Sequence, residues 1–158
     1  MHFEGRAPEE LGVMLGMVSR VGGLRVSLEI EKPRPGIEQL FHLPEVLLFS
    51  RHYARAVECD SAQSLLKRVA RQLGEQRPLL FCAWGDKGAW ALDRQGELLH
   101  APAVRLSTVV DTIAAGDVFN AAVIHALAHD ATSMEALEQG CKLAALKCSL
   151  EGVEALFY

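Results

Sequence analysis

The sequence predicts an α/β protein with a Rossmann-like, three-layer α/β/α fold and a largely parallel sheet. Helical patterns alternate with short apolar runs along the 158 residues, as parallel sheets require, because each crossover between parallel strands needs a long connection. The runs 46–49 (VLLF) and 79–83 (LLFCA) are apolar throughout, which is typical of strands buried on both faces. No repeat or linker interrupts the pattern, so we expect one domain over residues 1–158.

The first part of the chain predicts helices and strands in alternation. Pro8 and the acids that follow it suit the first turn of a helix, which Gly22 ends. Residues 24–31 alternate between polar and apolar side chains and therefore predict a strand. Ser50 is a candidate N-cap for a short helix. Short helices are expected at 37–42 and 51–57, on either side of the strand 46–49.

The second part continues the alternation. Asp60 or Ser61 can cap an amphipathic helix that leads to the strand 79–83. Residues 89–101 predict a hairpin, with strands at 89–93 and 97–101 around the turn DRQG. Val109 and Val110 indicate a further strand that ends at the segment 111–117. Two helices are expected to follow, at 115–129 and at 133–148, the second capped by Ser133.

Composition excludes several classes of protein. The formal net charge is −4 at pH 7, whereas nucleic-acid binders usually carry a basic excess. No apolar run reaches the roughly 20 residues of a membrane-spanning helix, and no secretory signal pattern opens the chain. The four cysteines lack Cys-x-x-Cys spacing, which favours reduced thiols over a zinc site or disulfides. We expect a cytoplasmic protein with no nucleic-acid or membrane partner.

The segment 111–117 (DTIAAGD) carries the clearest chemical signal. It places small residues and an acid at the start of a helix, where unpaired amides can hold an anion. Ala114, Ala115 and Gly116 would supply amides around phosphate groups. Asp117 would take the proton of an attacking hydroxyl group, as phosphoryl transfer requires. The alternatives are a tight connection that needs small residues for packing and an acid that complements the helix dipole.

Two neighbouring segments are weaker candidates. The oxygens of Asp111 and Thr112 could orient the loop or help to bind a cation, or could form a local Asx or Thr turn; their spacing does not separate these interpretations. The turn 85–88 (GDKG) follows a predicted strand and could contact a nucleotide, although such turns are more often structural. Lys87 within it is more readily explained as a solvated side chain.

Cysteine and histidine residues give little support for other chemistry. Cys141 is expected to be a small core residue, with packing against a nucleotide base as its functional alternative. His125 and His129 are spaced as half of a zinc site, but no third ligand follows at a matching position. We therefore predict no metal site formed by protein ligands alone.

Residues 111–122 (DTIAAGDVFNAA) resemble the Asp-Thr-x-Gly-Ala-Gly-Asp-x-Phe signature of the ribokinase-like (pfkB) carbohydrate kinases. Further segments resemble the members of this family that phosphorylate fructose, and the resemblance runs from Met1 to about residue 153. Those members lack the Asn-x-x-Glu motif of many others, and the strand end 49–53 (FSRHY) lacks it too. The segments are 2–6 (HFEGR), 26–34 (VSLEIEKPR), 81–84 (FCAW), 140–144 (GCKLA) and 147–148 (KC).

The resemblance implies a ribokinase-like fold and an ATP-dependent sugar kinase that uses Mg²⁺, with K⁺ as a further candidate cofactor. The acceptor would be the primary hydroxyl group of fructose, giving fructose 1-phosphate. Asp117 would be the catalytic base, and the amides of residues 114–117 would form the anion hole. Gly85, Asp86, Lys87 and Gly88 would contact the nucleotide, and Cys141 would line the adenine site.

The resemblance also implies that the chain corresponds to the C-terminal, nucleotide-binding part of the family pattern. The sugar-binding half and its lid would lie outside this sequence, leaving an exposed sheet edge or apolar face. The lid often mediates dimerisation, so a homodimer is expected only of a form that carries it. Two alternatives stay open: an inactive isoform or relic that binds nucleotide or a partner, and a kinase for another sugar or a nucleoside.

One residue departs from the signature. Ala114 stands where the family has glycine. If the backbone there has a positive φ, the Cβ atom of alanine costs on the order of 1 kcal/mol and could tilt the anion hole.

Overall fold

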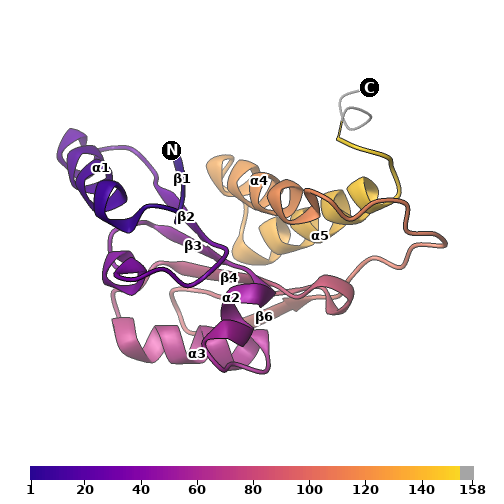
Figure 1. The fold of residues 1–158 in the computed structure, drawn as a ribbon, viewed down its shortest axis with the longest axis horizontal. Helices are drawn as coiled ribbons and strands as arrows, with labels where there is room; N and C mark the ends of the chain where they lie inside the picture. Colours follow the sequence, from indigo (N-terminus) through magenta and orange to yellow (C-terminus); the bar gives the residue numbers. More distant parts are fainter. Residues whose placement is uncertain (154–158) are drawn as a thin grey trace.

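The computed structural model describes residues 1–153, and a six-stranded sheet runs through this part of the chain (Figure 1). The spatial order of the strands follows the sequence: β1 (His2–Glu4), β2 (Ser27–Ile30), β3 (Val46–Phe49), β4 (Leu79–Ala83), β5 (Ala89–Leu92) and β6 (Leu98–Ala101). The first four strands are parallel, whereas β5 and β6 form the predicted antiparallel hairpin. The prediction of a largely parallel sheet is therefore confirmed.

Helices cover both faces of this sheet. The first face carries α1 (Pro8–Val21), α2 (Arg51–Ala56), α3 (Ala62–Leu73) and the 3₁₀ turn η1 (Ile37–Leu40); the second carries α4 (Ala115–Ala128) and α5 (Ser133–Cys148). Successive strand residues point to opposite faces. Leu47 of β3 accordingly packs in the first hydrophobic cluster, and Leu48 packs in the second.

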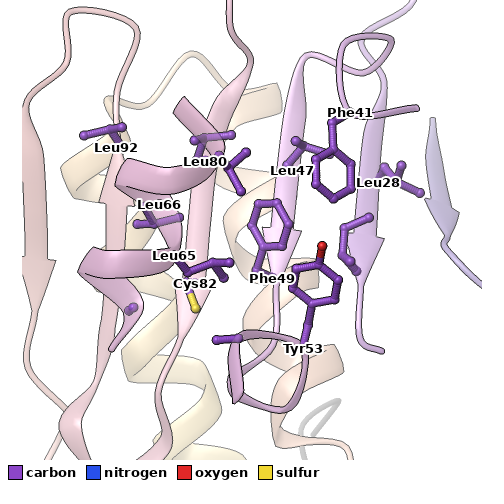
Figure 2. Packing of buried hydrophobic residues seen from close by; sticks show 14 of the residues in the cluster. Leu28, Phe41, Leu47, Phe49, Tyr53, Leu65, Leu66, Leu80, Cys82 and Leu92 are labelled. Atoms are coloured by element: carbon purple, nitrogen blue, oxygen red, sulfur yellow. The ribbon is translucent and has the colours of Figure 1, made fainter. Parts of the chain in front are cut away.

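The first cluster is built around three aromatic rings (Figure 2). The ring centroids of Phe41 and Phe49 lie 5.4 Å apart, and those of Phe49 and Tyr53 lie 5.5 Å apart. The Tyr53 hydroxyl group donates a hydrogen bond of 3.0 Å to Glu38 Oε1, which satisfies the only polar atom of that side chain. These rings pack the end of η1 and α2 against β3.

The segment between β6 and α4 differs from the prediction. Val109 and Val110 form no strand, and their side chains are 58% and 55% exposed. The backbone amide of Val110 donates to Cys148 O of α5 at 2.8 Å instead of joining the sheet. This segment swings out beyond the sheet before it returns to α4 (Figure 1). The segment 111–117 therefore follows a loop, whereas the turn η2 (Gly85–Lys87) follows β4 as expected.

Helix starts were predicted closely, with one correction. Ser61 caps α3, because its hydroxyl group accepts from the amide of Ser64 at 3.1 Å. Ser133 does not cap α5. Thr132 is the cap, and it exchanges hydrogen bonds with Glu135 three residues later, which forms a capping box.

One side of the molecule exposes apolar groups. Within residues 1–153, β1 pairs only with β2, which leaves its other edge open. Val13, Met17 and Val21 of α1 are 59%, 61% and 72% exposed. Across the described residues, none of the helices has the length and apolar character needed to cross a bilayer.

Candidate active site

The start of α4 presents free backbone amides. Ala114 precedes the helix with φ 61° and ψ 6°, a left-handed conformation that turns the chain out of the preceding loop. The Ala115 amide donates to Thr112 O at 3.3 Å. The amides of Gly116 and Asp117 meet no protein acceptor in the described part of the chain. Two exposed N–H groups therefore stand at the positive end of the helix dipole.

Packing does not require the glycine at position 116. A Cβ atom added to Gly116 would meet no protein atom within 4 Å, and the residue has no positive φ. The interpretation of 114–117 as a tight connection that needs small residues therefore fails at this position. The space beside Gly116 is therefore open to a ligand.

A cavity of about 580 Å³ lies against this turn. Its wall brings together the sequence-predicted residues Gly85, Asp86, Gly88, Ala115, Gly116 and Cys141. Lys87 is exposed and does not line the cavity, in agreement with its interpretation as a solvated side chain. The cavity also reaches Phe119 of α4, so residues from two distant turns and two helices share one wall.

The turn after β4 has structural constraints of its own. Gly88 has φ 87°, and a Cβ atom there would lie 2.1 Å from Ala101 O. His100 Nε2 lies 3.0 Å from Lys87 O, and the His100 ring stacks on Trp90 with centroids 4.1 Å apart. The structural interpretation of this turn is therefore correct for Gly88, and it is compatible with a place in the cavity wall.

Two cationic side chains of this wall were missed by the sequence analysis. Arg51 follows β3 at the carboxyl edge of the sheet, and Arg105 lies in the loop before α4. The Arg51 Nη1 atom lies 3.7 Å from Asp86 Oδ1. No motif marks either residue; the position of Arg51 directly after a buried strand was the only available signal. Guanidinium groups suit phosphate recognition.

Cys141 is a packing residue of the cavity wall. Its side chain is buried, and Sγ donates to Ala101 O at 3.6 Å. Burial raises the pKa of the Cys141 thiol to about 11, so the thiol stays protonated at neutral pH and is no nucleophile. This agrees with the expectation of a small core residue and leaves the thiol able to contact a flat ligand.

Asp117 opens to a different cavity. That cavity measures about 410 Å³ and is lined by His2, Glu4, Glu29 and Asn120 as well as Asp117. Burial raises the pKa of Glu29, and the nearby carboxylate of Asp117 raises it further. Gly116 and Asp117 are adjacent in the chain, yet they line separate cavities. The first turn of α4 therefore stands between two spaces.

Asp111 is fixed by several hydrogen bonds. Its Oδ1 atom accepts from the Ile113 amide at 2.8 Å, which is the Asx turn considered above. Lys147 donates to Asp111 O at 3.1 Å and also to Asp111 Oδ2. This ion pair lowers the pKa of the Asp111 carboxyl group. The described residues contain no group of three or more candidate metal ligands. The rings of His125 and His129 pack with their centroids 4.3 Å apart, and His129 Nδ1 lies 2.8 Å from His125 O.

The sequence of the chain matches known proteins. Residues 18–156 match the pfkB family of carbohydrate kinases. The chain belongs to the pfkB family of carbohydrate kinases. Mouse ketohexokinase is 37% identical over 163 residues, a stretch that includes 99% of this chain and 54% of the mouse protein. The chain thus spans about half the length of this pfkB relative.

Solved structures confirm the fold. Ribokinase from Thermotoga maritima superposes with a TM-score of 0.72 at 26% identity, covering 98% of this chain and 51% of that protein. Arabidopsis thaliana ribokinase complexed with ribose and ATP gives 0.77 at 17% identity, with coverages of 96% and 50%. The six-stranded sheet and its two helical layers are therefore ribokinase-like, as the sequence predicted.

Proposed function

We propose that the chain forms the nucleotide-binding and phosphoryl-transfer part of an ATP-dependent kinase that phosphorylates the primary hydroxyl group of fructose. The observation that carries this proposal is the placement of Gly116 and Asp117 on two separate cavities. A phosphoryl group held at the amides of the turn would lie between a donor on one side and an acceptor on the other.

The cavity beside Gly116 suits ATP. Its volume of about 580 Å³ falls within the range of roughly 300–1,000 Å³ of small-molecule sites. Ala83, Phe119 and Cys141 give it an apolar wall for a base. Arg51 and Arg105 add positive charge for the phosphates. The free amides of Gly116 and Asp117 would stabilise the negative charge that develops on the transferred group.

The cavity beside Asp117 would hold the acceptor. The hydroxyl oxygen of the sugar attacks the γ-phosphorus atom, the bond to the β,γ-bridging oxygen breaks, and ADP leaves. Asp117 takes the proton of the hydroxyl group, a contribution of roughly 10²–10⁴-fold for a well-placed base. Mg²⁺ bound to ATP would neutralise phosphate charge and needs only one or two protein carboxylates; Asp86 is the carboxylate that lines the cavity beside Gly116.

Fructose is favoured as the acceptor by the 37% identity with mouse ketohexokinase. The chain spans about half of that relative, so part of the acceptor pocket would be formed by other residues. Another sugar, a nucleoside, or nucleotide binding without catalysis are the competing outcomes. The cysteines found free in the structure, three of them buried, support a site of action in the reducing cytoplasm.

The test is a kinase assay on the protein at its natural length, with ATP, Mg²⁺ and a panel of fructose, ribose and adenosine. Asp117→Asn should reduce turnover by roughly 10²–10⁴-fold while preserving affinity for a non-hydrolysable ATP analogue. Asp60→Asn, which neutralises an exposed carboxylate elsewhere, is the matched control. Turnover that survives Asp117→Asn would exclude Asp117 as the base. Analogue binding without turnover of any acceptor would indicate an inactive binder, and no binding would reject the proposal.

A further inference from the structure

Lys147 is the one charged side chain that is fully buried within residues 1–153. It lies in the last turn of α5 and is 0% exposed. An ammonium group without water is unfavourable unless close oxygen atoms replace its hydration. Both of the hydrogen bonds that it makes go to Asp111, one to the backbone oxygen at 3.1 Å and one to Oδ2.

These contacts tie the end of α5 to the first residue of the segment 111–117. The amides of Val110 and Asp111 donate to Cys148 O at 2.8 Å and 3.3 Å. Asp111 Oδ2 also accepts from the Gly152 amide at 3.2 Å, and Oδ1 accepts from Ile113. The conformation that leads into the free amides of α4 is thus fixed from α5 rather than from the sheet.

The oxygens that hold Lys147 are also suitable ligands for a monovalent metal ion. A carbonyl oxygen and a carboxylate oxygen of one residue resemble the oxygen ligands that replace the hydration shell of K⁺. In this chain the ammonium group already takes both of them. Asp111 therefore does not fit K⁺, the further candidate cofactor implied by the family resemblance, because the positive charge is already present.

We propose that Lys147 is a positioning residue that acts as a built-in cation and holds the 111–117 turn in its anion-binding conformation without K⁺. The effect of Lys147 on nucleotide binding rests on the proposed function above. Its effect on the conformation of the turn is independent of that proposal, because amide hydrogen exchange measures it in the absence of any nucleotide.

The experiment compares wild type with Lys147→Ala, Lys147→Arg and Lys142→Ala. Lys142 is the matched control, because it lies on the same helix but is exposed; its Nζ atom lies 3.8 Å from Glu138 Oε2. Each protein is studied at equal ionic strength in choline chloride, potassium chloride or ammonium chloride. The two measurements are the dissociation constant of a non-hydrolysable ATP analogue and hydrogen exchange across residues 111–117.

In choline, Lys147→Ala should bind the analogue about tenfold more weakly than wild type and should exchange faster at 111–117. Potassium or ammonium should reverse much of both changes, because either ion can enter the vacated space. Lys147→Arg should lose less affinity for the analogue than Lys147→Ala does, and its exchange at 111–117 should increase less. For wild type and Lys142→Ala, the dissociation constant of the analogue should change by less than about twofold between the three salts.

Three results would overturn the inference: a Lys147→Ala variant that behaves as wild type, one that no cation restores, or a wild-type turn that itself tightens with potassium. If Lys147→Ala does not fold, the proposal is still tested by the measurements on wild type in the three salts and by the Lys147→Arg variant. If wild type binds no analogue, the proposed function fails, and the exchange data alone test the role of Lys147.

Discussion

The side-chain amide of Asn120 donates a hydrogen bond to Glu29, with 2.9 Å between Nδ2 and Oε1. It joins α4 to β2 across 91 residues of sequence. Asn120 lies one turn after Asp117 on the same helix, and both side chains line the cavity of about 410 Å³ described above. This bond therefore helps to fix the start of α4, with Asp117, relative to β2. It also keeps the partly buried carboxylate of Glu29 beside the proposed base.

The first prediction is that Glu29→Gln stabilises the protein at neutral pH. Burial, then Asp117, raises the pKa of Glu29 above its ordinary 4.5. The folded state therefore holds this proton to a higher pH than the unfolded state, and stability falls as pH rises from 4.5 through the folded pKa. Glutamine keeps the acceptor for Asn120 without the charge. The gain in stability from Glu29→Gln should be modest, because water screens a half-exposed carboxylate. It should vanish near pH 4, where the carboxyl group of Glu29 is protonated in the wild-type protein.

Urea denaturation between pH 4 and pH 8 measures this difference. Glu75→Gln, at an exposed loop residue, is the control and should show no such pH dependence. A constant difference between Glu29→Gln and wild type over the whole range would mean that the charge of Glu29 is not responsible.

The second prediction is that Ala114→Gly stabilises the protein. Ala114 has φ 61°, where a Cβ atom costs roughly 1 kcal/mol, and the greater freedom of glycine in the unfolded chain offsets part of the gain. We expect a net increase of less than about 1 kcal/mol in the free energy of unfolding. Glu58→Gly removes the Cβ atom at an exposed residue with φ 59° and should give a similar gain. Thermal denaturation compares the two, and a loss of stability in Ala114→Gly alone would show that its Cβ atom is needed.

Much of the fold could be predicted from residue patterns because the apolar strands β3 and β4 and the helical stripes are local features. The strand predicted at Val109 and Val110 was wrong because two β-branched residues favour a strand, whereas the Val110 amide donates to Cys148 O of α5. The predicted cap Ser133 was wrong by one residue, and the spacing to Glu135 already marks Thr132 by the capping-box rule.

The site was predictable only where a contiguous motif carries it. The segment 111–117 indicated the free amides and Asp117 directly. The burial of Lys147 depends on Asp111, 36 residues away, and no helical pattern places a lysine in the interior. Arg51 and Arg105 reach the cavity from separate loops, so their convergence is a property of the fold rather than of any local spacing.

The third prediction is that Gly140→Ala separates α4 from α5. A Cβ atom at Gly140 would lie 2.6 Å from a ring carbon of Phe119 and 2.9 Å from a methyl carbon of Val123. Overpacking of this kind costs about 1–3 kcal/mol, more than the roughly 1 kcal/mol that alanine returns through helix propensity. Nucleotide affinity should fall as well, because Phe119 lines the cavity beside Gly116 where we propose that ATP binds.

A second substitution tests that cause. Phe119→Leu in the Gly140→Ala background should recover part of the lost stability, whereas Phe119→Leu alone should destabilise, a coupling that a double-mutant cycle measures. Gly12→Ala of α1, where the nearest atom is Leu40 Cδ2 at 3.4 Å, is the control. Strictly additive effects of the two substitutions would exclude a direct clash.

The last prediction separates a binding glycine from a packing glycine. Gly116→Ala introduces a methyl group that meets no protein atom within 4 Å, and alanine favours a helix over glycine by up to roughly 1 kcal/mol. The variant should therefore be as stable as wild type or more stable. Nucleotide binding should nevertheless weaken, because the methyl group projects into the open space beside the free amides and hinders the close approach of a phosphate.

Titration calorimetry with an ATP analogue and thermal denaturation together give the answer. Gly16→Ala is the matched control, since a Cβ atom there also meets no atom within 4 Å, but on α1 and away from both cavities. It should gain stability and bind the analogue as wild type does. Gly116→Ala with unchanged affinity would contradict this prediction and would mean that the phosphates do not approach Gly116 closely.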